Sequence, residues 1–198
     1  NDIDNAIIAT LPYIQGAVFA YTQSDEISIL LTDFTKNTTS AWFDGNLQKI
    51  CSVSASILTA EFNRLRINRN RDNWNANRKS TEAYPGQETL AYFDSRVFII
   101  PDRTEVMNYF IWRNNDASRN SVSMVAQSLF SHSELQDKSS KEMQEMIFAK
   151  TNINWSEYPE ADKNGRLIVK EFYDVPVVTT NLPSKANLLA NNNVKRSR

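Results

Sequence analysis

The sequence contains few of the residues on which several common kinds of active site depend. Cys51 is its only cysteine, so a disulfide framework and a cysteine-rich zinc site are both excluded. His132 is its only histidine, and nothing around it suggests a Ser-His-Asp triad, so we expect a structural residue at a helix end. The four glycines are scattered at positions 16, 45, 86 and 165, which excludes a glycine-rich phosphate loop. Any phosphate binding must therefore use side chains and a metal ion.

Long apolar runs are also missing. No run reaches the roughly 18 residues that a membrane span needs, and the first residues lack the basic-then-apolar order of a secretory signal. The chain of 198 residues is 41% hydrophobic and 23% charged, a composition typical of a folded cytosolic protein. We therefore expect a cytoplasmic protein that does not bind membranes.

A β-hairpin with acidic residues at its tip is the most informative feature that is present. Two runs of strand-forming residues, near 17–22 and 27–33, flank the polar turn Ser24, Asp25 and Glu26. A hairpin tip holds an Asp carboxylate rigidly, and Mg²⁺ requires oxygen ligands in near-octahedral geometry. The alternative is an ordinary solvated turn, because Ser and Asp are common turn residues.

Basic residues gather in one segment although the net charge is only −1. This basic segment, 64–79, also contains Trp74 and several asparagines, and only Asp72 opposes its charge. Such a composition suits contacts with a nucleic-acid phosphate backbone. The alternative is a solvated, mobile loop, because residues 66–89 read as a long polar loop.

The remaining pattern predicts helices and strands in alternation. Ser139 and Glu142 have the spacing of a capping box at the start of a helix. The other predicted elements are a helix ending within 5–14, a helix at 46–63, a strand at 90–100, a helix at 104–130 and a strand at 166–173.

Three segments, taken in this order and spacing, resemble one family. They are residues 21–26 (Tyr-Thr-Gln-Ser-Asp-Glu), residues 92–97 (Tyr-Phe-Asp-Ser-Arg-Val) with Pro101, and residues 109–121, which begin Tyr-Phe-Ile-Trp-Arg. The similarity continues to about Lys170. The chain resembles the tRNA-His guanylyltransferases, and most of all their bacterial and phage relatives, the guanylyltransferase-like 3′-to-5′ polymerases.

The resemblance implies an α+β fold built on a polymerase- or cyclase-like palm, a ferredoxin-like βαββαβ sheet, with helices and a short strand after it. It implies that Asp25 binds metal as one of two carboxylates that hold two Mg²⁺ ions, and that Glu26 is catalytic beside it. Ser24, Arg96 and Asn120 would bind the triphosphate of ATP or GTP, or the RNA 5′ end. The tRNA would bind the basic residues Arg66, Arg69, Arg71, Arg78 and Lys79, and the protein would form a homotetramer.

Three further residues of these motifs carry open or structural interpretations. Arg113 and Asp116 stand three positions apart on a predicted helix, which suits a structural ion pair. For Asp94, a structural role at a strand end and a role in the site remain equally open.

Two departures from the family pattern refine the expectation. Residues 118–121 read Ser-Arg-Asn-Ser where the eukaryotic tRNA-His enzymes carry His-Ile-Asn-Asn, which points to templated repair of tRNA 5′ ends rather than G−1 addition. The family's second metal motif, Asp-Gly-Arg followed by Phe-His, has no counterpart before the hairpin. We therefore expect a fragment that lacks the first palm strand and is inactive alone.

The sequence predicts three regions: a partial palm catalytic domain at 1–101, a helical region with a terminal strand at 102–175, and a disordered tail at 176–198. The predicted function is metal-dependent nucleotidyl transfer to tRNA 5′ ends in the 3′-to-5′ direction. The alternatives are G−1 addition to tRNA-His, a non-catalytic RNA-binding palm module and a nucleotide-cyclase-like signalling domain. The helices after residue 103 weaken the last of these.

Overall fold

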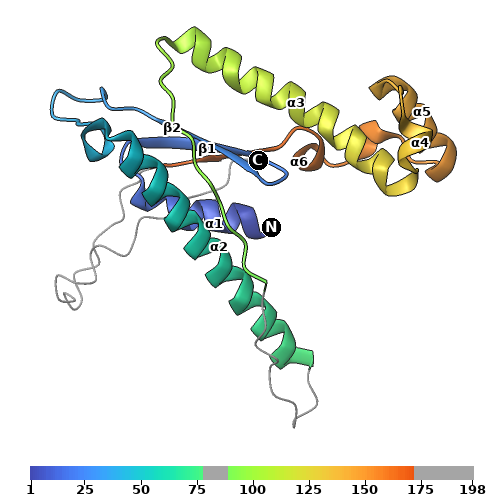
Figure 1. Ribbon diagram of the computed structural model, residues 1–198, viewed down its shortest axis with the longest axis horizontal. Helices are drawn as coiled ribbons and strands as arrows, with labels where there is room; N and C mark the ends of the chain where they lie inside the picture. Colours follow the sequence, from blue (N-terminus) through green and yellow to red (C-terminus); the bar gives the residue numbers. More distant parts are fainter. Residues whose placement is uncertain (78–88, 172–198) are drawn as a thin grey trace, which may run out of the picture. The chain divides into compact units, whose positions relative to one another are not determined.

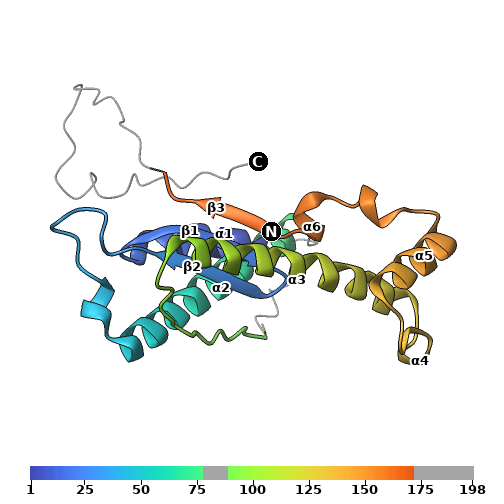
Figure 2. The same ribbon diagram turned by 90° about the horizontal axis from the view of Figure 1, so that it is seen from above.

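The computed structural model describes residues 1–77 and 89–171. In these residues a three-stranded antiparallel sheet has the order β2-β1-β3, with β1 at Ala17–Gln23, β2 at Glu26–Leu31 and β3 at Arg166–Val169. The chain ends β1 and begins β2 within two residues, which confirms the predicted hairpin. β3 runs beside β1 (Figure 2), and its Lys170 N–H donates to the Val18 carbonyl at 3.1 Å. The fold is thus a mixture of helices and a small antiparallel sheet.

The chain divides into two compact units. Of the described residues, the first unit contains 1–20, 28–77, 89–98 and 167–171, and the second contains 21–27 and 99–166. The hairpin tip therefore belongs to the second unit. Among the described residues, no helix has the length and apolar character needed to cross a membrane.

The first unit is built on two helices that lie side by side (Figure 1), α1 at Asp2–Thr10 and α2 at Leu47–Asn77. Short 3₁₀ turns follow α1 at Leu11–Tyr13 and precede α2 at Trp42–Gly45. Apolar side chains of α1, the turn after it and the sheet form the core. The buried members include Ala6, Ile7, Leu11, Ile14, Ala20 and Ile168.

Helix α2 is longer than the sequence predicts. Residues 66–77 are helical, so the prediction of a polar loop from residue 66 is wrong for this stretch; residues 78–88 lie outside the described part. No glycine or proline interrupts residues 47–77, and Arg and Asn side chains bond within the helix. An ion pair of 2.5 Å between Arg69 and Asp2 also joins this part of α2 to α1.

Residues 90–100 are extended but form no strand of the described sheet, so the strand prediction is wrong here. The segment alternates between half-buried and exposed positions from Ala91 to Phe98, as a strand with one covered face does. Its backbone groups bond to side chains of α2 rather than to a neighbouring strand. The Asn63 amide bonds to both the N–H (2.9 Å) and the carbonyl (2.8 Å) of Ala91, and the Phe93 N–H donates to the Thr59 hydroxyl at 3.1 Å.

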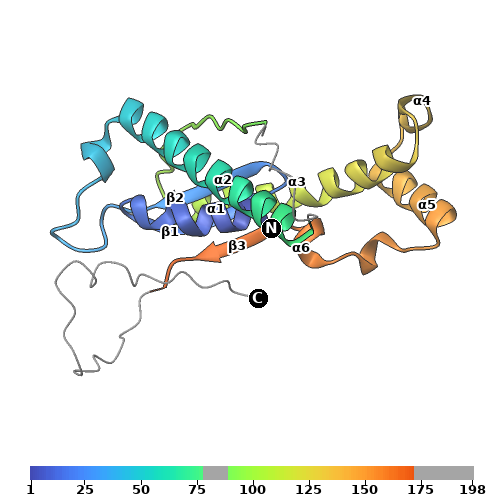
Figure 3. The ribbon, with the colours of Figure 1, turned by 90° about the horizontal axis from the view of Figure 1, so that it is seen from below.

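The second unit is largely helical. The long helix α3, Arg103–Leu129, confirms the helix predicted at 104–130, and it packs against α5, Ser140–Thr151 (Figure 3). The predicted capping box of Ser139 and Glu142 is present. The core of the second unit comprises Val122, Ala126, Leu135 and Ile147. The shorter elements are α4 at His132–Leu135, a 3₁₀ turn at Trp155–Glu157 and α6 at Glu160–Lys163.

Candidate functional site

The predicted site residues Ser24, Asp25 and Glu26 lie at the hairpin tip, where β1 ends and β2 begins. Ser24 and Asp25 form the turn, and Ser24 has a φ of 48°, in the left-handed region. The Thr22 hydroxyl donates to the Glu26 carbonyl at 3.0 Å, and the Gln23 amide donates to the Glu26 carboxylate at 3.2 Å. These bonds close the turn and leave the three acidic-turn residues, 24–26, exposed. The turn is therefore presented to solvent on a hydrogen-bonded base.

Asp25 is the residue of the turn whose carboxylate has no hydrogen-bond or ion-pair partner among the described residues. Its side chain is exposed to solvent. Nowhere in ranges 1–77 and 89–171 do three or more His, Cys, Asp or Glu side chains come together as a metal site. Asp25 thus fits as a single oxygen ligand, which suits Mg²⁺ because that ion commonly takes one or two carboxylates and completes its shell with phosphate and water.

Glu26 has a different environment, because it faces an arginine of α3. The Arg113 guanidinium contacts the Glu26 carboxylate, and it lies 3.6 Å from the Asp116 carboxylate. The predicted Arg113–Asp116 pair is therefore present. Asp116 also accepts a hydrogen bond from the Asn120 amide at 3.3 Å. A chain of polar contacts thus connects the hairpin tip to the exposed side chain of Asn120.

A second polar network lies under the hairpin, where β1 approaches α3. The Tyr21 hydroxyl donates to the Asn164 carbonyl at 2.7 Å, and the Asn114 amide donates to the same oxygen at 2.8 Å. Burial raises the pKa of the Tyr21 phenol, while the hydrogen bond to Asn114 and the charge of Arg113 oppose that rise. This network ties the end of β1 to the loop before β3.

The serines at the family's His-Ile-Asn-Asn position also bond within the second unit. The Ser118 hydroxyl donates to the Asn164 side-chain oxygen at 2.6 Å. The Ser121 hydroxyl donates to the Ser118 carbonyl at 2.8 Å and accepts from the Trp155 indole at 3.2 Å. Both hydroxyls therefore support the packing of α3 against the chain that follows α5.

Arg96 belongs to the first unit, unlike the other predicted triphosphate ligands Ser24 and Asn120. Its side chain is 88% exposed and lies 3.3 Å from the equally open carboxylate of Asp94. This pair is too exposed to contribute much to stability. The structure thus brings Ser24, Asp25 and Asn120 into one unit and places Arg96 in the other.

The predicted tRNA-binding residues are unequal in what they contact. Arg69 is paired with Asp2, so its charge is already partly neutralised. Arg66 lies over an aromatic ring of α2 and Arg71 bonds to an asparagine amide of the same helix, and within the described ranges neither faces a carboxylate. The last two predicted residues, Arg78 and Lys79, lie outside the described residues.

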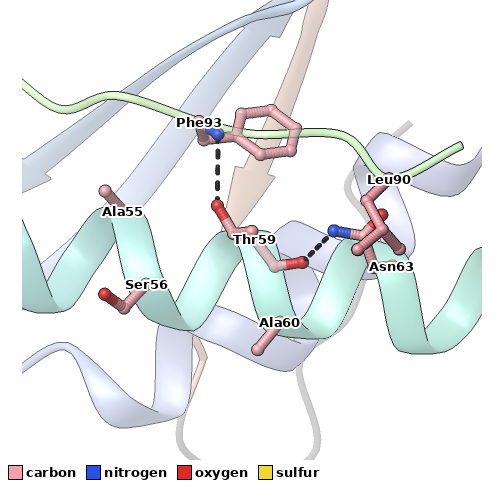
Figure 4. A pocket seen from close by; sticks show the side chains of 7 residues that line it. All are labelled: Ala55, Ser56, Thr59, Ala60, Asn63, Leu90 and Phe93. Carbon is pink, nitrogen blue, oxygen red and sulfur yellow. Dashed lines mark hydrogen bonds between the residues drawn. The ribbon is translucent and has the colours of Figure 1, made fainter.

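A shallow groove on α2 is a further hollow in the first unit. Figure 4 shows Phe93 above the helix and Thr59 bonded to the Phe93 backbone. None of its lining residues is charged, so the groove offers no cation for a triphosphate. They are Ala55, Ser56, Thr59, Ala60, Asn63, Leu90 and Phe93.

Two features of the site could not be found in the sequence. The sequence predicts only the pair of Arg113 with Asp116, because a helix spacing of three residues is visible in it and a contact with Glu26, 87 positions away, is not. No motif of the sequence points to Asn164, although Tyr21, Asn114 and Ser118 all donate hydrogen bonds to it. Its one sequence signal is the following Gly165, a common partner of Asn in turns.

Comparison with known proteins places this architecture among described relatives. The family described as tRNAHis guanylyltransferase matches residues 2–101. A bacterial tRNA(His) guanylyltransferase-like protein in complex with ATP is 44% identical, with a TM-score of 0.74 over 87% of this chain and 67% of that one. A structure of such a protein in complex with GTP is 41% identical, with a TM-score of 0.64 over 88% of this chain and 66% of that one.

A curated relative extends the comparison to eukaryotes. The tRNA(His) guanylyltransferase of Kluyveromyces lactis is 28% identical over 168 residues, which are 80% of this chain and 65% of that protein. This chain spans 56% and 65% of the lengths of two curated relatives that it matches. The family match over half of the residues, with the hairpin site inside it, shows that the chain belongs to the tRNA(His) guanylyltransferase family.

Proposed function

We propose that this chain is part of a metal-dependent nucleotidyltransferase that adds nucleotides to tRNA 5′ ends in the 3′-to-5′ direction, under the direction of the opposite strand. The observation that carries the proposal is the family match over residues 2–101, which includes the hairpin. The 44% identity to a bacterial guanylyltransferase-like protein in complex with ATP supports it. ATP and GTP are accordingly the proposed substrates, with tRNA as acceptor.

Asp25 is the residue that would hold Mg²⁺, because its carboxylate is exposed and unpaired among the described residues. The ion would polarise the triphosphate and activate the attacking group, as in other phosphoryl transfers. Ser24, in the same turn, and the exposed amide of Asn120 would orient the triphosphate in the second unit. Arg96 keeps its proposed role toward the triphosphate or the RNA 5′ end on family resemblance alone.

Binding of tRNA is assigned to the basic half of α2. Arg66 and Arg71 are the strongest candidates, because no carboxylate of the described chain opposes them. Arg69 would have to exchange Asp2 for a phosphate, and that exchange reduces its net contribution. A homotetramer is part of the same proposal and rests on family resemblance, and the proposed cytoplasmic location rests on the composition of the chain.

Templated addition is favoured over G−1 addition by the serines of α3. Ser118 and Ser121 are both engaged in hydrogen bonds within the second unit, so neither hydroxyl is free to read a base. Watson–Crick pairing with the 3′ strand would then select the incoming nucleotide. Base stacking and pairing contribute about 1.4 kcal/mol per step, which corresponds to about tenfold in rate.

The test compares two nucleotide additions by the full-length protein in one tRNA background. A truncated tRNA receives G opposite C, and a matched tRNA receives G opposite A. We expect kcat/KM for the paired product to be larger by about tenfold or more. A kcat/KM ratio near one, or a preference for the unpaired product, would contradict templated repair and favour G−1 addition as the function.

Asp25→Asn separates the enzyme from an RNA-binding module. The variant should lose nucleotide addition and keep nearly full tRNA affinity, because phosphate contacts dominate that affinity. Glu105→Gln is the matched control, since Glu105 is an acid of the first turn of α3, far along that helix from Asn120. If the unmodified protein binds tRNA and adds no nucleotide, the non-catalytic RNA-binding reading is correct.

A further inference from the structure

Arg113 is unusually buried for an arginine on a helix that packs at a protein surface. Its side chain is only 11% exposed, whereas the Glu26 side chain that it contacts is 58% exposed. The Trp112 ring covers it from the side, with the Arg113 Cζ atom 4.9 Å from the ring centroid. A guanidinium with so little access to water depends on its carboxylate partners for compensation.

The partners of Arg113 lie on two different elements. Glu26 begins β2 and follows directly on the proposed metal ligand Asp25, while Asp116 lies one turn further along α3. Arg113 therefore bridges the hairpin and the helix within the second unit. Asp116 in turn bonds to Asn120 at 3.3 Å, so the bridge also reaches the proposed triphosphate ligand.

Glu26 is committed to this bridge by two independent contacts. Its carboxylate receives both the Arg113 guanidinium and the Gln23 amide, the latter at 3.2 Å. Asp25, one residue earlier, makes no hydrogen bond or ion pair with the other described residues. The two adjacent acids at the hairpin tip therefore have different environments: Glu26 is bonded to other side chains, and Asp25 is exposed to solvent.

We propose that Arg113 is a positioning residue that holds the hairpin tip against α3 through Glu26, and that Glu26 acts through this ion pair rather than as a ligand of metal or nucleotide. The catalytic part of this inference rests on the proposed function. The positioning of residues 22–28 does not, and it can be measured separately.

The first measurement follows amide hydrogen exchange in the full-length protein without substrates. Arg113→Met and Glu26→Gln should each speed exchange in residues 22–28 and leave α5 unchanged, because the bridge closes on the hairpin. Arg119→Met is the matched control: Arg119 is 62% exposed and lies 3.9 Å from the same Asp116, but it does not contact Glu26. Unchanged exchange at residues 22–28 in Glu26→Gln, a near-isosteric change of an exposed residue, would overturn the proposal.

The second measurement follows nucleotide addition in a double-mutant cycle. Each single variant should lower kcat by about 10–100-fold with little change in KM for tRNA, because a misplaced reacting group costs rate rather than binding. The double variant should be no less active than the weaker single variant, because both substitutions remove the same ion pair, Arg113–Glu26. Additive losses would assign Glu26 a separate contact with metal or nucleotide and refute its positioning role. If the unmodified protein adds no nucleotide, the proposed function fails while the exchange result still decides the positioning of the hairpin.

Discussion

Gly165→Ala is a substitution for which the structure predicts a large loss of stability. Gly165 immediately precedes β3 and has a φ of +76°, a conformation that residues with a Cβ rarely adopt. A Cβ atom at this position would lie 2.6 Å from the Tyr21 hydroxyl oxygen and 2.7 Å from the Thr22 carbonyl oxygen. The substitution therefore combines backbone strain with a collision against the strand that leads to the hairpin tip.

The expected magnitude has two parts. The left-handed conformation costs a residue with a Cβ about 1–2 kcal/mol, and forcing extra volume into a filled space costs about 1–3 kcal/mol. Together they predict a loss of about 2–5 kcal/mol in the free energy of unfolding. Gly45→Ala is the matched control, because Gly45 has a φ of +74° and no heavy atom lies within 4 Å of its added Cβ. It should lose only the backbone part.

Urea unfolding followed by circular dichroism measures both losses, and hydrogen exchange over residues 21–27 shows whether the hairpin is affected. Gly165→Ala should exceed Gly45→Ala by about 1–3 kcal/mol and should loosen the hairpin. Adding Tyr21→Phe should recover only part of the loss, because the Thr22 carbonyl stays in place. Equal losses for the two glycines would refute the close approach on which this reasoning depends.

Two further predictions concern pH and salt. Burial raises the pKa of the Tyr21 phenol, so the folded protein holds that proton more tightly than the unfolded chain does. The stability that Tyr21 contributes is therefore complete below about pH 10 and is lost as the pH rises through the folded pKa. In urea titrations across that pH range, Tyr21→Phe should lose less stability than the unmodified protein, and parallel curves would contradict the prediction. Neutralising Arg66 and Arg71 together should flatten the salt dependence of tRNA binding by about 0.7–0.9 log units per lost phosphate contact. The control Arg64→Gln, which removes the ion-pair partner of Glu61, should change that slope little. An unchanged slope in the double variant would assign α2 a purely structural role.

The elements that the sequence predicts correctly are those with a strong local signal. The hairpin follows from two β-branched and aromatic runs around a polar turn, and the start of α5 follows from Ser139 and Glu142 at capping-box spacing. Helix α3 follows from the periodicity of its apolar residues. In each case the residues that decide the structure are within a few positions of one another.

The errors arise where local composition and tertiary contacts disagree. Residues 66–77 are polar enough to read as a loop, but the absence of helix breakers and the Arg69–Asp2 pair keep them helical. Residues 90–100 have the composition of a strand, but their backbone groups bond to Asn63 and Thr59 on α2. Neither partner can be recognised from the neighbouring sequence. The same holds for the site, where Asp25 could be proposed from its turn and the Arg113–Glu26 contact could not.

The bond between Asn63 and Ala91 restricts the chemistry that position 63 of α2 can tolerate. A carboxamide carries a donor and an acceptor in one plane, as a peptide group does, so this side chain acts as a strand neighbour one residue long. Asp would turn a second oxygen toward the Ala91 carbonyl, and Leu would leave both backbone groups without a partner. Asn63 is only 8% exposed, so each lost bond would cost about 1–3 kcal/mol. Together with the Thr59 hydroxyl, which accepts from the Phe93 N–H, this amide determines where the extended segment runs. Neither Asp nor Leu, the residues nearest to Asn in size, can replace it.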